Sequence, residues 1–136
     1  MLGFENNRIS ICREIAVRPE TIWMVLTDTH LWPLWGPSLL RVDGQDRYIR
    51  LGSRGRVQTL LYLWLPFTIS EFRDLEYWSW RIGPFRATGH KLVRTGDTSS
   101  VLCFDMPWWA VAYVPVCWLA LIRIEKLASQ QRFDLH

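Results

Sequence analysis

The chain has 136 residues, close to the size of one typical domain, so we expect a single domain over residues 1–136. Hydrophobic residues make up 49% of the chain and charged residues 21%, a globular composition that excludes a largely disordered chain. The formal net charge is +3 and the 16 Lys and Arg are scattered, which excludes a dense nucleic-acid-binding surface.

The three cysteines, Cys12, Cys103 and Cys117, lie far apart and show no CxxC or CxxH spacing. This spacing argues against a zinc site, and the three histidines offer no other metal site, so we expect no metal. An odd number of dispersed cysteines predicts reduced core residues of an intracellular protein. The N-terminus reaches Glu5 before any apolar run can form, so we expect no secretory signal and a cytoplasmic location.

The first predicted element is a strand over residues 8–17, where apolar side chains alternate imperfectly with polar ones. Pro19 suits the first turn of a helix and Glu20 adds an acid there, so we predict a short helix to about Thr27. Residues 28–37 contain two prolines and a glycine, which leaves room for one helical turn at most.

Residues 38–106 consist of short apolar runs separated by turn signals about every ten residues. This spacing is typical of consecutive antiparallel hairpins, so we expect about six strands here and six or seven in the whole sheet. Residues 77–82 alternate best, with Trp78, Trp80 and Ile82 on one face.

The pattern changes after Pro107. Residues 108–122 carry no charge and charged residues return from Arg123, which is compatible with a long C-terminal helix that Pro115 starts or kinks. Leu121 lies on the apolar stripe of this helix. The order of elements predicts an α+β fold with helices packed on one face of an antiparallel sheet.

Four stretches of the sequence form recognisable motifs. They are Pro19-Glu20-x-Ile22-Trp23-x-x-Leu26-x-Asp28, Trp32-Pro33-x-Trp35-x-Pro37, Gly52, and a strand ending His90-x-Leu92 before Gly96-Asp97-Thr98. On these motifs the chain from about Ile9 to Ala128 resembles the START-like superfamily, also called SRPBCC or the polyketide cyclase/dehydrase and lipid-transport superfamily. The resemblance implies a helix-grip fold, in which a curved antiparallel sheet wraps a long C-terminal helix around a deep apolar cavity.

Members of that superfamily bind or transport lipids, quinones, polyketides or hormones, and a minority catalyse cyclisation or dehydration in the cavity. The resemblance therefore implies a hydrophobic small-molecule ligand for this chain, and we expect no cofactor. The tryptophans either line such a cavity or fill it. The candidate ligand-binding residues are Trp35, Trp78, Trp80, His90, Leu92 and Leu121.

His90 is the histidine best placed for chemistry, because Thr88, His90 and Leu92 share one strand face. It can orient a ligand carbonyl, act as a base, or serve as a hydrogen-bonded structural residue. Glu71 and Asp105 lie in apolar strands, and either is a candidate acid partner in a cyclase or dehydratase. Strand parity leaves open which face of the sheet they occupy, so catalysis stays an alternative to simple binding.

The uncharged run from Met106 to Ile122 is too short and too rich in proline for a membrane span. Its aromatic side chains nevertheless extend the apolar surface around the start of the final helix. They predict peripheral contact with a membrane surface, a homodimer contact, or closure of the cavity; the residues concerned are Trp108, Trp109, Tyr113, Trp118 and Ile122.

Overall fold

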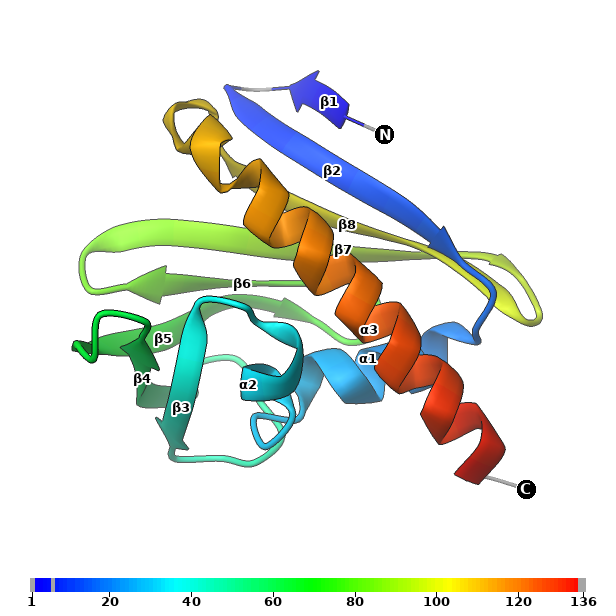
Figure 1. The fold of residues 1–136 in the computed structure, drawn as a ribbon, viewed down its shortest axis with the longest axis horizontal. Helices are drawn as coiled ribbons and strands as arrows, with labels where there is room; N and C mark the ends of the chain where they lie inside the picture. The colour runs from blue at the N-terminus through cyan, green and yellow to red at the C-terminus, as the bar shows by residue number, and fades with distance from the viewer. Residues whose placement is uncertain (1, 6, 135–136) are drawn as a thin grey trace.

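The computed structural model describes residues 2–5 and 7–134 (Figure 1). These residues form eight strands and three α-helices, with one 3-10 helix before the last α-helix. In chain order they are β1 (Leu2–Glu5), β2 (Arg8–Ile15), α1 (Pro19–Thr27), α2 (Trp32–Trp35), β3 (Leu39–Gly44), β4 (Arg54–Thr59), β5 (Trp64–Arg73), β6 (Tyr77–Ile82), β7 (Phe85–Gly96), β8 (Ser99–Pro107), η1 (Trp108–Tyr113) and α3 (Val114–Asp134).

The strands form one antiparallel sheet in the order β1-β2-β8-β7-β6-β5-β4-β3. From β3 to β8 each strand pairs with the next along the chain, as the spacing of turn signals predicted. β2 then pairs with β8, which joins the two ends of the chain in one sheet. The additional strand is β1, an edge strand whose four residues are too few for periodicity to reveal.

Helix α3 lies diagonally across one face of the curved sheet (Figure 1). Its inward stripe buries Cys117, Leu121, Ile124 and Ala128, as helical periodicity predicted. Pro115 is the second residue of α3, where a missing N–H breaks no helical hydrogen bond. The proline therefore starts the helix, and the preceding aromatic residues form η1.

Helices α1 and α2 pack against α3. Two tryptophans of α2 tie it to α1, because Trp32 Nε1 donates to the carbonyl of Leu26 at 2.9 Å and Trp35 Nε1 to that of Val25 at 3.1 Å. These carbonyls lie near the C-terminal end of α1, where a helix leaves acceptors without helical partners. The tryptophan–proline motif is thus the part of the sequence that fixes α2 beneath α3.

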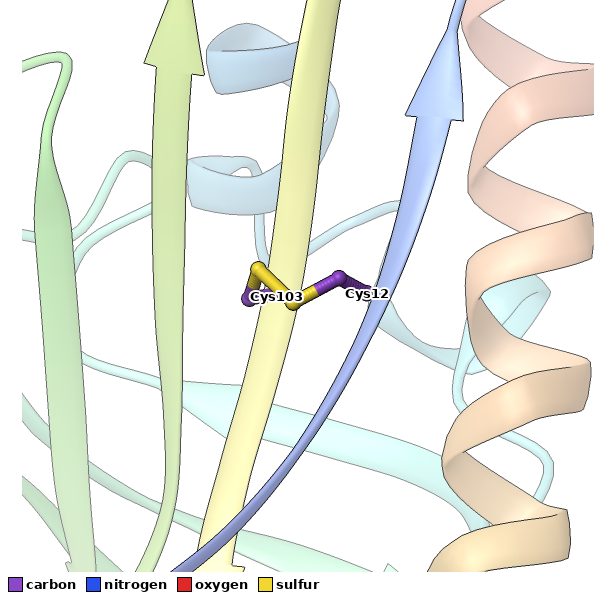
Figure 2. Close-up of a disulfide and its surroundings, with 2 residues drawn as sticks. All are labelled: Cys12 and Cys103. Carbon is purple, nitrogen blue, oxygen red and sulfur yellow. A yellow bond between two sulfur atoms is a disulfide. The ribbon is translucent and has the colours of Figure 1, made fainter. Parts of the chain in front are cut away.

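Cys12 and Cys103 form a disulfide (Figure 2), so the expectation that all three cysteines are reduced is wrong for this pair. The two residues lie opposite each other on β2 and β8 with Cα atoms 4.0 Å apart, although 91 positions separate them in sequence. Spacing along the chain missed the pair because the pairing of distant strands brings them together. Cys117 is free and buried. Because these two cysteines are oxidised, reduced cysteines no longer support the prediction of a cytoplasmic location.

The fold is α+β and helix-grip-like: an open antiparallel sheet, a long C-terminal helix across it, and two short helices after β2. This confirms the fold class predicted from the sequence. A hydrophobic core packs between the sheet and the helices. Within residues 2–5 and 7–134, no helix combines the length and the apolarity needed to cross a membrane.

Candidate functional site: a cavity between the sheet and the C-terminal helix

A cavity of about 580 Å³ lies between the sheet and the helices that cover it. This volume is within the range of small-molecule sites in proteins. Inward side chains of β4 to β8 form one wall, and residues of α2, η1 and α3 form the other. Most of the lining side chains are apolar or aromatic; they include Trp35, Leu39, Val57, Leu65, Trp78, Trp80, Ile82, Phe104, Met106, Tyr113 and Val116.

Strand alternation explains which residues reach the cavity. On β8, Phe104 and Met106 line the cavity, so Asp105 between them points to the opposite face of the sheet. On β6, Trp78 and Trp80 line it, and the Trp80 indole donates to the Thr88 hydroxyl at 3.0 Å.

Stacked aromatic rings form part of the cavity wall. The Trp32 and Trp78 rings are nearly parallel, with centroids 5.4 Å apart, and the His90 ring stacks on Trp78 at 3.8 Å. Phe104 meets His90 edge-on. The tryptophans therefore do both things that the sequence left open: Trp32 and Trp78 pack the core, and a cavity remains beside them.

His90 is buried and lines the cavity. Its Nδ1 lies 3.2 Å from the backbone carbonyl oxygen of Trp78, which can only accept, so Nδ1 carries the ring proton. Burial lowers the pKa of His90 to about 4, against smaller opposing effects from the Trp78 carbonyl and Asp105. The imidazole is therefore neutral at pH 7, with Nε2 as an acceptor.

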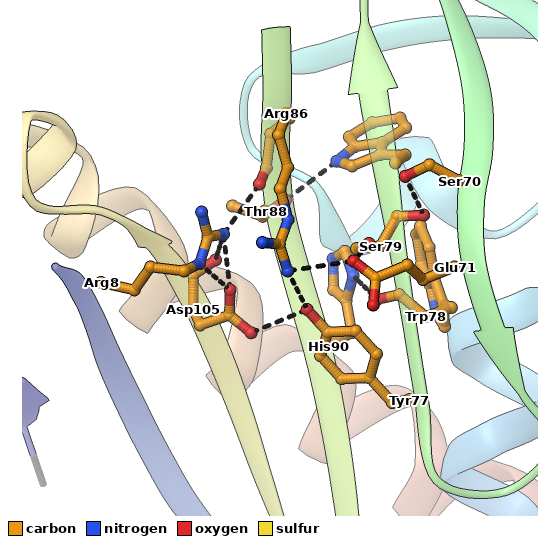
Figure 3. Close-up of polar contacts among 12 residues, drawn as sticks. Arg8, Ser70, Glu71, Tyr77, Trp78, Ser79, Arg86, Thr88, His90 and Asp105 are labelled. Atoms are coloured by element: carbon orange, nitrogen blue, oxygen red, sulfur yellow. Dashed lines mark hydrogen bonds and ion pairs between the residues drawn. The ribbon is translucent and has the colours of Figure 1, made fainter. Parts of the chain in front are cut away.

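Asp105 belongs to a polar network on the outer face of the sheet (Figure 3). Its Oδ1 accepts from Arg8 Nε at 2.6 Å, and its Oδ2 accepts from the Tyr77 hydroxyl at 3.2 Å. Burial, and then the Asp105 charge, raise the pKa of Tyr77, which keeps the phenol protonated as a donor. Gly89 lies next to both the Tyr77 and the Asp105 side chains. A Cβ at this position would collide with both of them, which explains why the residue is a glycine.

Glu71 belongs to the same outer network. Its Oε1 accepts from the Ser79 hydroxyl at 3.1 Å and lies 3.0 Å from Arg86 Nη2 (Figure 3). Arg86 in turn donates to the Tyr77 hydroxyl. The structure thus joins Glu71 and Asp105 to each other through this network and does not bring either to His90, the base they were candidates to assist.

Four of the six candidate ligand-binding residues line the cavity: Trp35, Trp78, Trp80 and His90. The other two, Leu92 and Leu121, face inward as expected but are enclosed in the core and do not line it. Alternation along a strand predicts the inward direction, but it does not distinguish a core position from a cavity wall. That distinction depends on where α3 crosses the sheet.

The sequence analysis missed several lining residues near the opening of the cavity. Phe85 and Trp109 both line it while remaining 65% and 63% exposed, so the cavity reaches solvent beside them. Tyr113 of η1 also lines it, and its hydroxyl hydrogen-bonds with that of Ser38 in the connection before β3. One signal could have identified Phe85. Ile82 continues the inward face of Trp78 and Trp80, and Phe85 pairs with Ile82 across the turn between β6 and β7.

His30 takes no part in this site, because it is exposed in the connection between α1 and α2. His136 lies outside the described residues. In the part of the chain that the structure describes, no three His, Cys, Asp or Glu side chains gather as metal ligands would.

Comparisons with known proteins show likeness in structure alone. No family model and no curated protein sequence matches the chain. Among solved structures, protein MLL2253 from Mesorhizobium loti is similar with a TM-score of 0.71 at 18% identity, over 90% of this chain and 97% of that one. Protein NE0264 from Nitrosomonas europaea has a TM-score of 0.65 at 17% identity, over 95% and 99%.

Norcoclaurine synthase from Thalictrum flavum, solved in complex with dopamine and hydroxybenzaldehyde, is also similar. Its TM-score is 0.65 at 13% identity, over 90% of this chain and 86% of that one. At such low identities the likeness establishes the fold and no more. The chain therefore has the same helix-grip-like fold as these proteins.

Proposed function

We propose that the protein binds a hydrophobic small molecule, such as a lipid, quinone or polyketide-like compound, in the cavity between the sheet and α3. The observation that carries the proposal is the cavity of about 580 Å³ with its mainly apolar lining. Burying ~300 Å² of apolar ligand surface contributes about 7 kcal/mol before entropic losses, which is enough for useful affinity. The START-like resemblance, which we retain as a proposed family, supports the same function.

The similar fold of norcoclaurine synthase, solved with two small aromatic molecules, makes aromatic compounds natural first probes. Cyclase or dehydratase chemistry is less well supported than binding. Burial lowers the pKa of His90 to about 4, which leaves its imidazole a weak base at pH 7, and neither Glu71 nor Asp105 shares its face of the sheet.

Ligand binding is tested by titrating tryptophan fluorescence with a panel of a fatty acid, a short-chain ubiquinone and a tricyclic aromatic, with native mass spectrometry alongside. We expect at least one to quench the fluorescence saturably. Val116→Phe, which adds bulk to the cavity lining, should weaken that binding about tenfold or more. Leu119→Phe, at an exposed position one turn away on α3, is the matched control and should bind as the wild type does.

Two results would contradict the binding function. One is the absence of quenching and of any co-purified molecule across the whole panel. The other is equal weakening by Val116→Phe and Leu119→Phe, because binding would then take place elsewhere than in the cavity.

A second candidate function is docking on a lipid bilayer, and the distribution of apolar loops favours it. Antiparallel hairpins place alternate turns at opposite ends of the sheet. The turn between β4 and β5, the turn between β6 and β7, and the exit from β8 into η1 all lie at one end (Figure 1). No charged residue occurs in these three segments, residues 60–63, 83–84 and 107–113. We call them the apolar tips.

The apolar tips are exposed. Leu61 and Tyr62 are 79% and 74% accessible, and Trp108 and Trp109 are 58% and 63% accessible. The turns at the opposite end of the sheet, residues 45–53, 74–76 and 97–98, all contain charged residues. Separate apolar tips rich in Trp, Tyr and Leu suit insertion among lipid headgroups better than a flat contact with another protein. The cavity opens beside Phe85 and Trp109, so an apolar ligand would pass from bilayer to cavity without crossing water.

Docking is tested by co-sedimentation with phosphatidylcholine vesicles, with and without phosphatidylserine. The wild type should sediment with the vesicles, and Leu61→Ser with Trp109→Ser should lower the partition coefficient about tenfold or more. Leu51→Ser, at a leucine 64% exposed at the charged end, is the matched control and should sediment like the wild type. A wild type that stays in solution overturns the proposal. So does sedimentation velocity showing a dimer that the double substitution abolishes, since the tips would then be a homodimer contact.

A further inference from the structure

One segment of the cavity wall is held by few buried contacts. This segment is η1, whose residues Trp109, Ala110, Ala112 and Tyr113 line the cavity. None of its six residues, all of which the structure describes, is buried. Its backbone departs from helical dihedral angles at Ala110, so η1 is not one regular helix. A segment with so little buried surface can open locally while the rest of the fold stays intact.

Hydrogen bonds hold η1 at its two ends. At its start, the Trp108 backbone N–H donates to the carbonyl of Asn7 at 3.0 Å, in the turn between β1 and β2. At its end, the Tyr113 hydroxyl hydrogen-bonds with the hydroxyl of Ser38. Ser38 belongs to residues 36–39, which follow α2 and also line the cavity. Because α2 is itself tied to α1 by hydrogen bonds, η1 is the side of this contact that can move.

The opening of the cavity lies beside the same segment. Trp109 of η1 and Phe85 line the cavity while most of their surface is exposed. Cys117, one turn beyond Tyr113 on α3, lines the cavity as well but is only 2% exposed. The passage to this inner wall widens when η1 moves away from residues 36–39. The hydrogen bond between the two hydroxyls opposes that motion.

We propose that η1 is a gate of the cavity and that the Ser38–Tyr113 hydrogen bond is its latch. The proposal rests on the proposed function, because it states how a ligand enters and leaves. The latch joins two parts of the wall, so it favours the closed gate equally with and without ligand. Breaking it should therefore raise the association and dissociation rates by the same factor and leave the dissociation constant unchanged.

Cys117 allows the gate to be tested without any ligand. Its thiol is free, buried and part of the lining, so a small thiol reagent reaches it when the cavity opens. Labelling with methyl methanethiosulfonate, followed by mass spectrometry, should be about threefold or more faster in Tyr113→Phe and in Ser38→Ala than in the wild type. The double variant should label no faster than either single variant, because both changes remove the same bond.

Two controls separate gate opening from other routes to the thiol. Tyr48→Phe, at an exposed tyrosine that does not line the cavity, should label like the wild type. Labelling rates should also stay constant in urea well below the unfolding transition, since labelling through global unfolding would rise steeply with urea.

Binding kinetics give a second readout. Stopped-flow mixing with N-phenyl-1-naphthylamine, a neutral apolar dye, should show association and dissociation both about threefold or more faster in Tyr113→Phe, with an unchanged dissociation constant. Weaker affinity without faster association overturns the gate, because the Tyr113 hydroxyl would then contact the dye.

The labelling results overturn the gate in three cases while ligand binding itself stands. The single substitutions leave the rate unchanged, their effects multiply in the double variant, or the rates rise steeply in low urea. Absence of binding by the dye and by the wider panel overturns the proposed function instead, whatever the thiol labelling shows.

Discussion

Removing the Cys12–Cys103 disulfide should lower the free energy of unfolding by about 4–5 kcal/mol and the melting temperature by about 15–20 °C. The bond joins positions 91 residues apart, so it closes most of the chain into one loop and sharply restricts the unfolded state. It also joins β2 to β8, the one pairing that connects the N-terminal hairpin to the strands that follow. Urea unfolding of Cys12→Ala with Cys103→Ala, compared with the oxidised wild type, measures the effect.

Reducing agent supplies the control for this prediction. It should destabilise the wild type to about the level of the double variant and leave the double variant unchanged, because the remaining Cys117 is free. Thiol titration of the denatured, non-reduced wild type should find one thiol. Three thiols, or a double variant as stable as the oxidised wild type, would contradict the prediction.

Local patterns in the sequence predicted the elements well because the physical causes there are local. Pro19 fixes the start of α1, and alternation on residues 77–82 predicted the inward face of Trp78 and Trp80. In each case the residues that determine the outcome lie within one turn or one strand. The aromatic wall of the cavity follows from such alternation together with the antiparallel order of the hairpins.

Features that depend on pairing across the sheet could not be predicted in this way. The disulfide requires the register of β2 on β8, which fixes that Cys12 meets Cys103. The position of Asp105 required a choice between two strand parities, and the apolar neighbours Phe104 and Met106 settle it by burial. Both outcomes follow from non-local contacts that no spacing along the chain encodes.

The stability of the protein should fall more steeply in acid than its carboxylates alone would cause, because His90 is buried as the neutral base. Its folded pKa of about 4 lies below the unfolded value of about 6.5, so the unfolded state binds the proton first as the pH falls. This histidine therefore costs no stability above pH ~7. Between pH ~7 and pH ~4.5 its titration should remove about 2.5 kcal/mol from the free energy of unfolding.

His90→Gln removes this titration and should show a loss between those pH values smaller by about 2.5 kcal/mol than that of the wild type, measured by urea unfolding at each pH. Comparing differences with pH cancels any constant cost of losing the ring contacts with Trp78 and Phe104. His30→Gln, at an exposed histidine, should follow the wild-type curve. If the His90→Gln curve runs parallel to that of the wild type, the imidazole gains its proton as easily in the folded protein as in the unfolded chain. The cavity wall beside Trp78 would then be wetter and more polar than the stacked rings and the apolar lining imply.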